Sequence, residues 1–446
     1  MEKRSSACLL LRIKQVIPFC LLYFLLYSPL ISAAQSASEK TWPNILWISV
    51  EDISPLLGVY GDRIAKTPVI DKLAEDGMLF THAFSTSGVC SPSRTAIITG
   101  MHQASIGTHH HRSTHTGHSY KTTADHEPLV GMAAPYQVVP PPYVKTFTEY
   151  LRAAGYYTTN NSKTDYNFGL PVTAWDESGR QAHWRNAPEG HPFFSVVNIG
   201  ITHEAQIWPD PGRPLTVDPA AVEVPPYLPD TPVVRQDIAQ QYSNIQRMDS
   251  RVGQILAELE EDGLADKTVV FFWSDHGGAL PRQKSWIYDS GIHVPLIIRW
   301  PGVVEPGSVN GELVSLIDLA PTVLSIADVN IPSHMQGRAL LGSQRSASPT
   351  YIYAAADRHD EVYDMMRAVR DAQFKYIRNY FPNQPYLGMN EYRHRMPVMQ
   401  EILRLRAEGN LEGAETFWQH QTRPAEELYD VTKDPHEIVN LVRESI

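Results

Sequence analysis

The fold is decided by the stretch Asn44-Ile-Leu-Trp-Ile-Ser-Val50 and the two acids that follow it, Glu51 and Asp52. A short, continuous apolar run of this kind is typical of a parallel strand with both faces covered. Two further runs share the pattern: residues 268–273, ending at Ser274-Asp275-His276-Gly277, and residues 192–201, ending at Thr202-His203-Glu204. Polar groups that gather where parallel strands end predict an open α/β sheet with a site along its carboxyl edge.

Between the strands, apolar residues recur with the period of an α-helix. The longest stripe, which we assign to the core, consists of Ile238, Tyr242, Ile245, Met248, Val252, Ile255, Leu256 and Leu259. The proline-rich residues 208–229 are predicted to form a loop. Residues 336–348 are mostly polar or small. We therefore expect a catalytic domain over residues 42–340 and a smaller α+β domain over residues 349–446.

The composition is that of a globular protein with a large core, because 43% of the 446 residues are hydrophobic and 20% are charged. Lys and Arg number 38 against 49 Asp and Glu, which gives a formal net charge of -11. No basic stripe or polybasic tail interrupts this acidic balance. Nucleic acid is therefore excluded as a partner, since a phosphate backbone requires a basic surface.

The chain begins with a pattern typical of a secretory signal. Four cations (Lys3, Arg4, Arg12 and Lys14) precede an apolar run over residues 16–30, which ends in the small residues Ser32, Ala33 and Ala34. The alternative is a permanent anchor, but the run has only about 15 residues and a spanning helix needs roughly 20. We expect residues 1–34 to be removed and the protein to be exported to the periplasm or the extracellular space, with no stable membrane insertion afterwards.

Loss of the signal would remove Cys8 and Cys20 and leave Cys90 alone. A lone thiol in an exported protein is either buried and inert or kept for chemistry. Its surroundings read Gly88-Val-Cys-Ser-Pro-Ser-Arg-Thr-Ala-Ile-Ile-Thr-Gly100. This pattern places Cys90 in a tight turn before a helix, whose N-terminal amides favour an anion. Arg94, one turn further on, can help to hold that anion.

The pattern C-x-P-x-R followed by Thr99-Gly100 resembles the signature of the type I sulfatases, in which the cysteine is oxidised to formylglycine. The resemblance runs from about Pro43 to Asn440. It implies an alkaline-phosphatase-like α/β fold: a large mixed, mostly parallel sheet sandwiched by helices, with a smaller C-terminal α+β domain. Residues 224–232, two segments of the following helix and His203 resemble the heparan N-sulfatase branch in particular.

The resemblance also implies a divalent cation, with Glu51, Asp52, Cys90, Asp275 and His276 as the metal site. Oxygen-rich ligation points to Ca²⁺, or alternatively to Mg²⁺, rather than to Zn²⁺. Glu51 departs from the family, which usually has Asp at this position. Its longer side chain therefore leaves open whether it binds the metal in the same way.

The catalytic residues implied by the resemblance are Cys90, Arg94, Lys163, His203 and Lys284. The hydrate of an aldehyde carries two hydroxyls on one carbon, so one can attack sulfur and the other can then collapse and expel the sulfate. The cation and the surrounding cations would balance the negative charge of the sulfate. A second departure lies beside Lys163, where Asp165 replaces the histidine of the family.

A histidine cluster follows the predicted catalytic helix: His109, His110, His111, His115 and His118. A zinc site is one interpretation, but the run is loop-like and lacks Cys or Glu at ligand spacing. We instead assign His110 to substrate binding. Arg358 lies in the charged run Asp357-Arg-His-Asp-Glu361, which fits either a sugar subsite or an exposed turn.

The sequence thus predicts a sulfatase that hydrolyses sulfate esters of a carbohydrate and depends on a formylglycine-generating maturation enzyme. Three alternatives stay open: an N-sulfoglucosamine sulfohydrolase (a sulfamidase), a phosphomonoesterase or phosphonate hydrolase of the same superfamily, and an inactive glycan-binding relative. Cys90 within its full motif argues against the second, and the nearly complete residue set argues against the third.

Overall fold

The computed structural model describes residues 42–111, 137–210, 212–360 and 362–442, and the chain from Pro43 onward forms one compact unit. The predicted signal at residues 1–34 lies outside the described residues, as do His115, His118 and Glu361.

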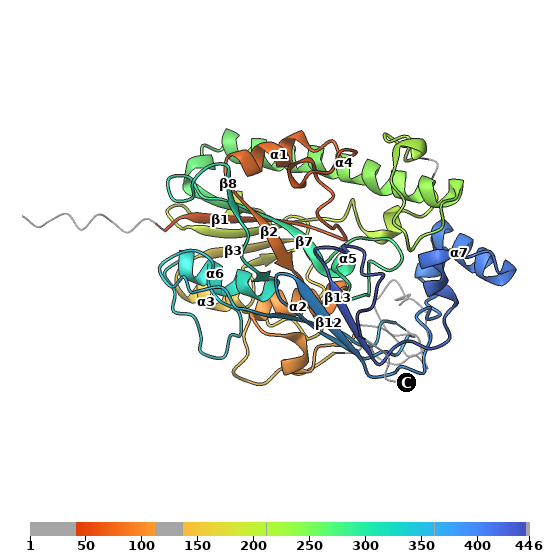
Figure 1. Ribbon diagram of the computed structural model, residues 1–446. Coiled ribbons are helices and arrows are strands. Elements are labelled where there is room, and N and C mark those ends of the chain that lie inside the picture. Colours follow the sequence, from red (N-terminus) through yellow and green to blue (C-terminus); the bar gives the residue numbers. More distant parts are fainter. Residues whose placement is uncertain (1–41, 112–136, 211, 361, 443–446) are drawn as a thin grey trace, which may run out of the picture. The chain divides into compact units, whose positions relative to one another are not determined.

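A large mixed sheet forms the centre of this unit (Figure 1). Among the described residues its strand order is β4-β3-β5-β1-β6-β7-β2-β8, with β9 beside β2. Within this described set of strands, only β7 runs antiparallel to its neighbours. The strands are β1 (Asn44–Val50), β2 (Met78–Phe84), β3 (Tyr157–Asn161), β4 (Glu177–Ser178), β5 (Phe193–Ile199), β6 (Thr268–Ser274), β7 (His293–Arg299), β8 (Ser308–Asn310) and β9 (Val314–Ser315). The predicted mixed, mostly parallel sheet is confirmed.

Helices cover both faces of this sheet (Figure 1). One face carries α1 (Pro68–Glu75) and α4 (Pro232–Glu261), and the other carries α2 (Cys90–Thr99), α3 (Phe147–Ala153) and α6 (Leu319–Ile326). Strand β1 shows why, because Leu46 and Ile48 belong to one hydrophobic cluster while Ile45 and Trp47 belong to another. Successive side chains of a strand point to opposite faces, so a continuous apolar run requires a cover on each side.

Helix α4 begins where the sequence provides a start signal. Thr231 caps it by accepting a hydrogen bond from the Val234 amide at 3.4 Å, and Pro232 occupies the first turn. The stripe assigned to the core is buried, with Leu256 partly exposed. This helix therefore closes one face of the sheet through its apolar side.

A second, antiparallel sheet follows in the chain, with strand order β10-β11-β12-β13. Its strands are β10 (Ile352–Ala356), β11 (Met366–Arg370), β12 (Phe374–Asn379) and β13 (Glu426–Asp430), and α7 (Pro397–Glu408) lies between the last two in the sequence. It shares a hydrophobic cluster with Trp286, Tyr288 and the short helix α5 (Asp289–Ile292). The smaller C-terminal α+β part is thus present, while its boundary at residues 340–349 stays a prediction.

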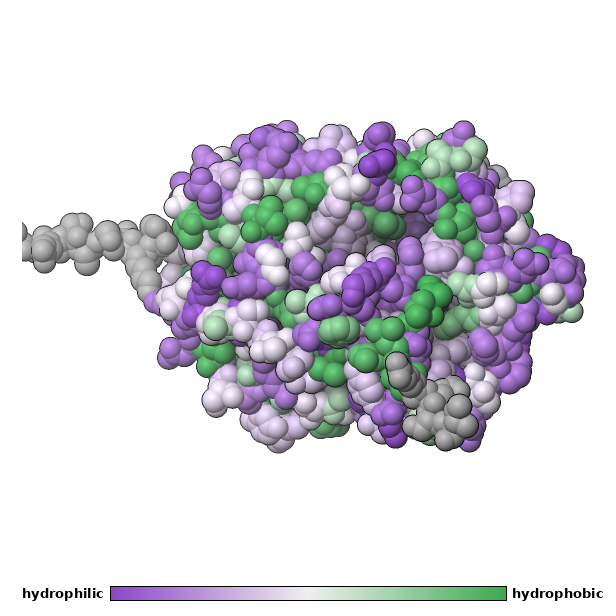
Figure 2. All heavy atoms as spheres, in the orientation of Figure 1, coloured by the Kyte–Doolittle hydropathy of each residue, from purple (hydrophilic) through white to green (hydrophobic). Residues whose placement is uncertain are grey.

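The face drawn in Figure 2 mixes hydrophilic and hydrophobic residues, and a hollow opens in it near α7. Among the described residues, no helix combines the length and the apolar character needed to cross a membrane.

Candidate active site

Four neighbouring strands end at one edge of the large sheet and deliver most of the predicted site residues. Glu51 and Asp52 follow β1, Asp275 follows β6, and His203 follows β5. Because β5, β1 and β6 are adjacent and parallel, these side chains meet at the carboxyl edge. Lys163 arrives from the end of β3, on the far side of β5.

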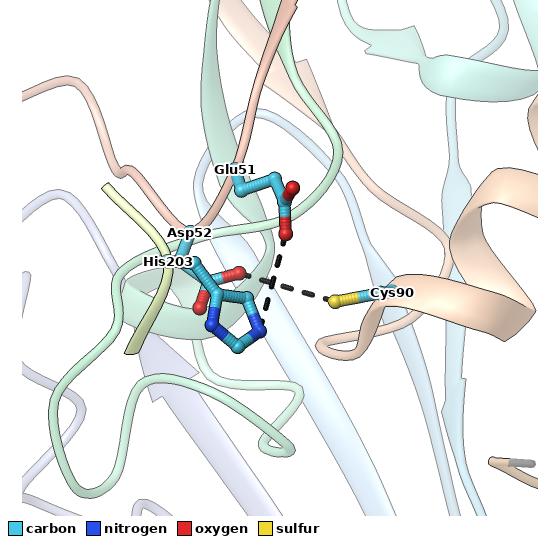
Figure 3. Close-up of side chains that lie close together, drawn as sticks. All are labelled: Glu51, Asp52, Cys90 and His203. Atoms are coloured by element: carbon cyan, nitrogen blue, oxygen red, sulfur yellow. Dashed lines mark hydrogen bonds and ion pairs between the residues drawn. The ribbon is translucent and has the colours of Figure 1, made fainter. Parts of the chain in front are cut away.

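Cys90 is the first residue of α2 and points from the helix start toward this edge (Figure 3). Its side chain is buried, with Sγ 3.3 Å from His276 Nε2 and 4.0 Å from Asp52 Oδ1. Gly88 allows the preceding turn to approach closely, since a Cβ at this position would collide with the carbonyl oxygen of Trp286. The turn therefore sets the cysteine against the loop that carries Lys284.

Asp52 occupies the centre of the site. Its backbone adopts φ 56°, a left-handed conformation that Asp tolerates better than most residues, and its amide donates to Asp275 Oδ1 at 3.3 Å. One carboxylate oxygen lies 3.0 Å from His276 Nε2, and the other accepts from Lys284 Nζ at 2.7 Å. Burial alone would raise the pKa of Asp52, but Lys284 and His276 hold it well below its usual value.

Arg94 fixes Asp275. Its Nε donates to Asp275 Oδ2 at 2.8 Å, and its terminal nitrogens donate to Asn198 Oδ1 and Ser49 Oγ. Sequence reasoning gave this guanidinium a role in balancing the charge of the substrate. In the structure it holds the Asp275 carboxylate, which lies beside Cys90, and its role toward the substrate stays a prediction.

His276 presents one ring nitrogen to the site. Its Nδ1 lies 3.1 Å from the carbonyl oxygen of Gly277, which fixes the ring and directs Nε2 toward Asp52 and Cys90. Burial works against a charged imidazole, but Asp275 and Asp52 raise the pKa of His276 to about 10. With these acids alone as neighbours, the ring would hold a proton at neutral pH.

One ligand atom each from Asp52, Cys90, Asp275 and His276 lies within 4.8 Å of the others. Two carboxylates and an imidazole nitrogen, all buried and aimed at one point, are a donor set that fits a divalent cation. Glu51 belongs to an overlapping group with Asp52, Cys90 and His203.

Glu51 lies close to a lysine and a histidine of the site. Its Oε2 accepts from Lys163 Nζ at 2.5 Å and lies 3.9 Å from His203 Nε2 (Figure 3). Asp165, which replaces the expected histidine, lies 3.5 Å from the same ammonium group. The two departures from the family pattern are thus neighbours, because both acids contact Lys163.

The cations around Cys90 make it an unusually acidic thiol. Burial by itself would raise its pKa, but Lys163, Lys284 and His276 hold the pKa of Cys90 well below the ordinary value. Lys284 Nζ lies 3.3 Å from His203 Nε2. The site is therefore built to accept negative charge at the position of Sγ.

His110 and Arg358 lie next to each other. The Arg358 amide donates to His110 Nδ1 at 3.3 Å, and the His110 carbonyl accepts from Asn167 Nδ2. Burial, with His109 and Arg358 in addition, lowers the pKa of His110 to about 4. The two candidate substrate-binding residues are thus neighbours, and His110 is uncharged at neutral pH.

Sequence reasoning missed Glu204 and Asn198. The buried Glu204 places Oε1 3.1 Å from Lys284 Nζ, and its amide donates to Asp52 Oδ2. Asn198 holds Arg94. Glu204 follows His203 directly, so its position after a strand was a usable signal, whereas nothing in the sequence marks Asn198 within its strand.

Comparison with known proteins identifies the family of this chain. The family model described as Sulfatase matches residues 43–181 and 180–329. A second model, described as N-sulphoglucosamine sulphohydrolase, C-terminal, matches residues 281–392. The chain belongs to the sulfatase family, and it is a sulfuric ester hydrolase by that membership.

Individual relatives support the same assignment. An ulvan-active sulfatase of Formosa agariphila is 43% identical over 90% of this chain and 71% of its own length. The human N-sulphoglucosamine sulphohydrolase is 29% identical over 89% of this chain and 85% of its own. The solved phosphonate monoester hydrolase of Agrobacterium radiobacter shares the fold, with a TM-score of 0.65 at 17% identity over 90% of this chain and 92% of its own.

Proposed function

We propose that this chain removes sulfate from an O-sulfated polysaccharide or oligosaccharide through a formylglycine formed from Cys90. The observation that carries the proposal is the position of Cys90 at the start of α2, buried between Asp52 and His276 and surrounded by Lys163 and Lys284. A sulfate ester brings its negative charge to that position, and the site offers matching positive charge.

The proposed cation is Ca²⁺, with Mg²⁺ as the alternative, held by Asp52, Asp275 and His276 together with the modified Cys90. Glu51 can approach it from the side of Lys163. Bound there, the cation would lower the pKa of a hydroxyl and draw negative charge from a sulfate oxygen. Arg94 serves this site by keeping Asp275 in one orientation.

The formylglycine, once hydrated, supplies a hydroxyl that can attack sulfur and a second hydroxyl that can later release the sulfate. Lys284 and Lys163 are positioned to bind the sulfate oxygens. His203 is positioned to hold a proton for the leaving sugar oxygen. Burial and Lys284 lower its pKa, but Asp52 and Cys90 outweigh them, so that the pKa of His203 is raised. This direction holds for the chain with an unmodified Cys90.

Sequence identity to the two relatives favours one substrate class over the other. The ulvan-active sulfatase shares 43% of aligned residues with this chain, against 29% for the sulfamidase. We therefore propose O-sulfate hydrolysis, with ulvan as the first polysaccharide to test and N-desulfation as the second candidate. We also propose export by the signal at residues 1–34 and maturation by a formylglycine-generating enzyme.

The test is sulfate release, measured by ion chromatography on paired O-sulfated and N-sulfated saccharides and on ulvan, with a phosphate monoester as the competing substrate. Cys90→Ala is the matched control and should release no sulfate. We expect O-sulfated saccharides to be turned over fastest. Faster turnover of the phosphate monoester than of every sulfated saccharide would contradict the proposal, and exclusive N-desulfation would replace it with the sulfamidase.

A further inference from the structure

Three side chains that the proposed mechanism leaves without a role meet beside the active site: His111, His359 and Asp360. His111 Nδ1 lies 3.2 Å from Asp360 Oδ1, and His359 Nε2 lies 3.3 Å from the other oxygen, Oδ2. One ligand atom from each of the three lies within 4.8 Å of the other two. A single carboxylate thus stands between two imidazoles.

Neighbouring groups hold the three side chains in place. His359 Nδ1 contacts the hydroxyl of Ser285, which accepts a hydrogen bond from Arg393 Nη2 at 2.6 Å. Asn390 Nδ2 donates to Asp360 Oδ2 at 3.2 Å. The His111 amide donates to the Arg358 carbonyl at 2.8 Å. In metal sites, the second nitrogen of a ligating histidine is usually held by a hydrogen bond in this manner.

We propose that His111, His359 and Asp360 bind a second metal ion, Zn²⁺, at a site separate from the cation site at Asp52 and Asp275. Two imidazole nitrogens and one carboxylate oxygen are ligands that zinc prefers, whereas Ca²⁺ and Mg²⁺ require more oxygen. The side chains of His111 and Asp360 are 20% and 21% exposed, so a fourth ligand can enter from solvent. Three protein ligands and one open position are the arrangement of an accessible zinc site.

The consequence is a link between parts of the chain that are far apart in sequence. His111 follows the catalytic helix, while His359 and Asp360 follow β10 of the second sheet. A zinc ion would join these segments next to Ser285, the neighbour of Lys284. It would also place a positive charge at the edge of the site, with its open position available to water or to an anionic oxygen of a ligand.

Zinc binding can be measured without reference to sulfatase activity. The experiment uses untagged, metal-stripped Cys90→Ala protein. The substitution removes the thiolate, which is a strong zinc ligand at the other site, and millimolar Ca²⁺ is added to occupy the oxygen-rich site. Calorimetric titration with Zn²⁺ should then show one strong site per chain. In the same background, Asp360→Asn and His359→Gln should each weaken zinc affinity at least about 10-fold.

His191→Ala serves as the matched control, because this histidine is exposed and remote in sequence from the three ligands. The zinc affinity of the His191→Ala variant should match that of the Cys90→Ala protein in which it is made. Asn is chosen to replace Asp360 because Asn also tolerates the positive φ of 51° that the backbone adopts at this position.

Zinc-soaked crystals of the unsubstituted protein provide a readout that does not depend on the folding of any variant. An anomalous peak bounded by His111 Nδ1, His359 Nε2 and the Asp360 carboxylate would support the site. Unchanged zinc affinity in both ligand variants would overturn it, as would an anomalous peak found only elsewhere. In that case His111 and His359 simply donate their protons to Asp360.

Discussion

Glu51 and Asp52 are adjacent in the chain but serve different partners. Asp52 turns toward Lys284 and His276, while Glu51 contacts Lys163 and stands near His203. Both acids nevertheless stay close to Cys90, because one ligand atom each from Glu51, Asp52, Cys90 and His203 lies within 4.8 Å of the others. A single strand end therefore supplies two acids beside the cysteine, and the first of them, Glu51, also holds Lys163.

The proposed cation site can be tested through Asp275. Replacing it with Ala removes an anionic ligand and leaves Arg94 without its carboxylate partner. We expect sulfate release to fall by at least about 100-fold, which is the scale on which loss of a fixed electrostatic group acts. Added Ca²⁺ should raise the melting temperature of the parent but not that of Asp275→Ala, because only a ligand that binds the folded state stabilises it.

Asp371→Asn provides the control for the change of charge, since Asp371 lies in a turn of the second sheet and accepts hydrogen bonds from the Gln373 and Phe374 amides. It should keep both activity and the response to Ca²⁺. Full activity of Asp275→Ala after exhaustive chelation would show that this carboxylate holds no catalytic cation.

At the scale of elements, three glycines allow backbone segments around the site to approach one another closely. Gly88 precedes the cysteine, Gly277 follows His276, and Gly291 lies in α5 behind the Lys284 loop. A Cβ at each of them would collide with a backbone carbonyl of a facing segment. These close approaches bring the start of α2, the end of β6 and the Lys284 loop into one site.

Gly88→Ala should therefore displace α2 relative to the loop that carries Lys284. We expect a destabilisation of about 1–3 kcal/mol, the usual cost of overpacking, and a fall in kcat that is larger than any change in KM. Thermal unfolding and steady-state kinetics measure both effects. Gly169→Ala is the control, because no atom lies within 4 Å of its added Cβ. Equal behaviour of the two variants would count against this role for Gly88.

The sequence predicted those elements whose signals are local. β1, β5 and β6 were visible as apolar runs with polar ends, and α4 was visible as a stripe. Partnerships across the chain were not visible: Arg94 with Asn198, Lys284 with Glu204, and His111 with Asp360. Such pairs depend on how distant loops pack, and neither spacing nor periodicity records that packing.

At the scale of the whole molecule, Asp237 connects the helix that covers the large sheet to the C-terminal part. It lies in α4 and accepts a hydrogen bond from the Val398 amide in the first turn of α7 at 2.7 Å. Burial raises the pKa of Asp237 to about 7, although that hydrogen bond acts in the opposite direction. The folded chain therefore binds a proton here at pH values where the unfolded chain has released it.

Since the folded-state pKa lies above the unfolded value of about 3.9, this group makes stability fall as the pH rises from about 4 to about 7. Asp237→Asn keeps an acceptor for the Val398 amide and removes the charge. We expect the variant to be more stable than the parent by about 2–4 kcal/mol at pH 8, with the difference closing near pH 4. Denaturant unfolding at both pH values measures this, and a difference independent of pH would refute it.

The nucleophile that we propose for this sulfatase is Cys90 after its conversion to formylglycine. The most direct measurement is the intact mass of the tryptic peptide over residues 73–94, taken on samples whose sulfate release is assayed in parallel. We expect a fraction of the peptide in which oxygen replaces the sulfur of Cys90 and two hydrogens are lost, with activity proportional to that fraction. Full activity in protein that carries only unmodified Cys90 would contradict it.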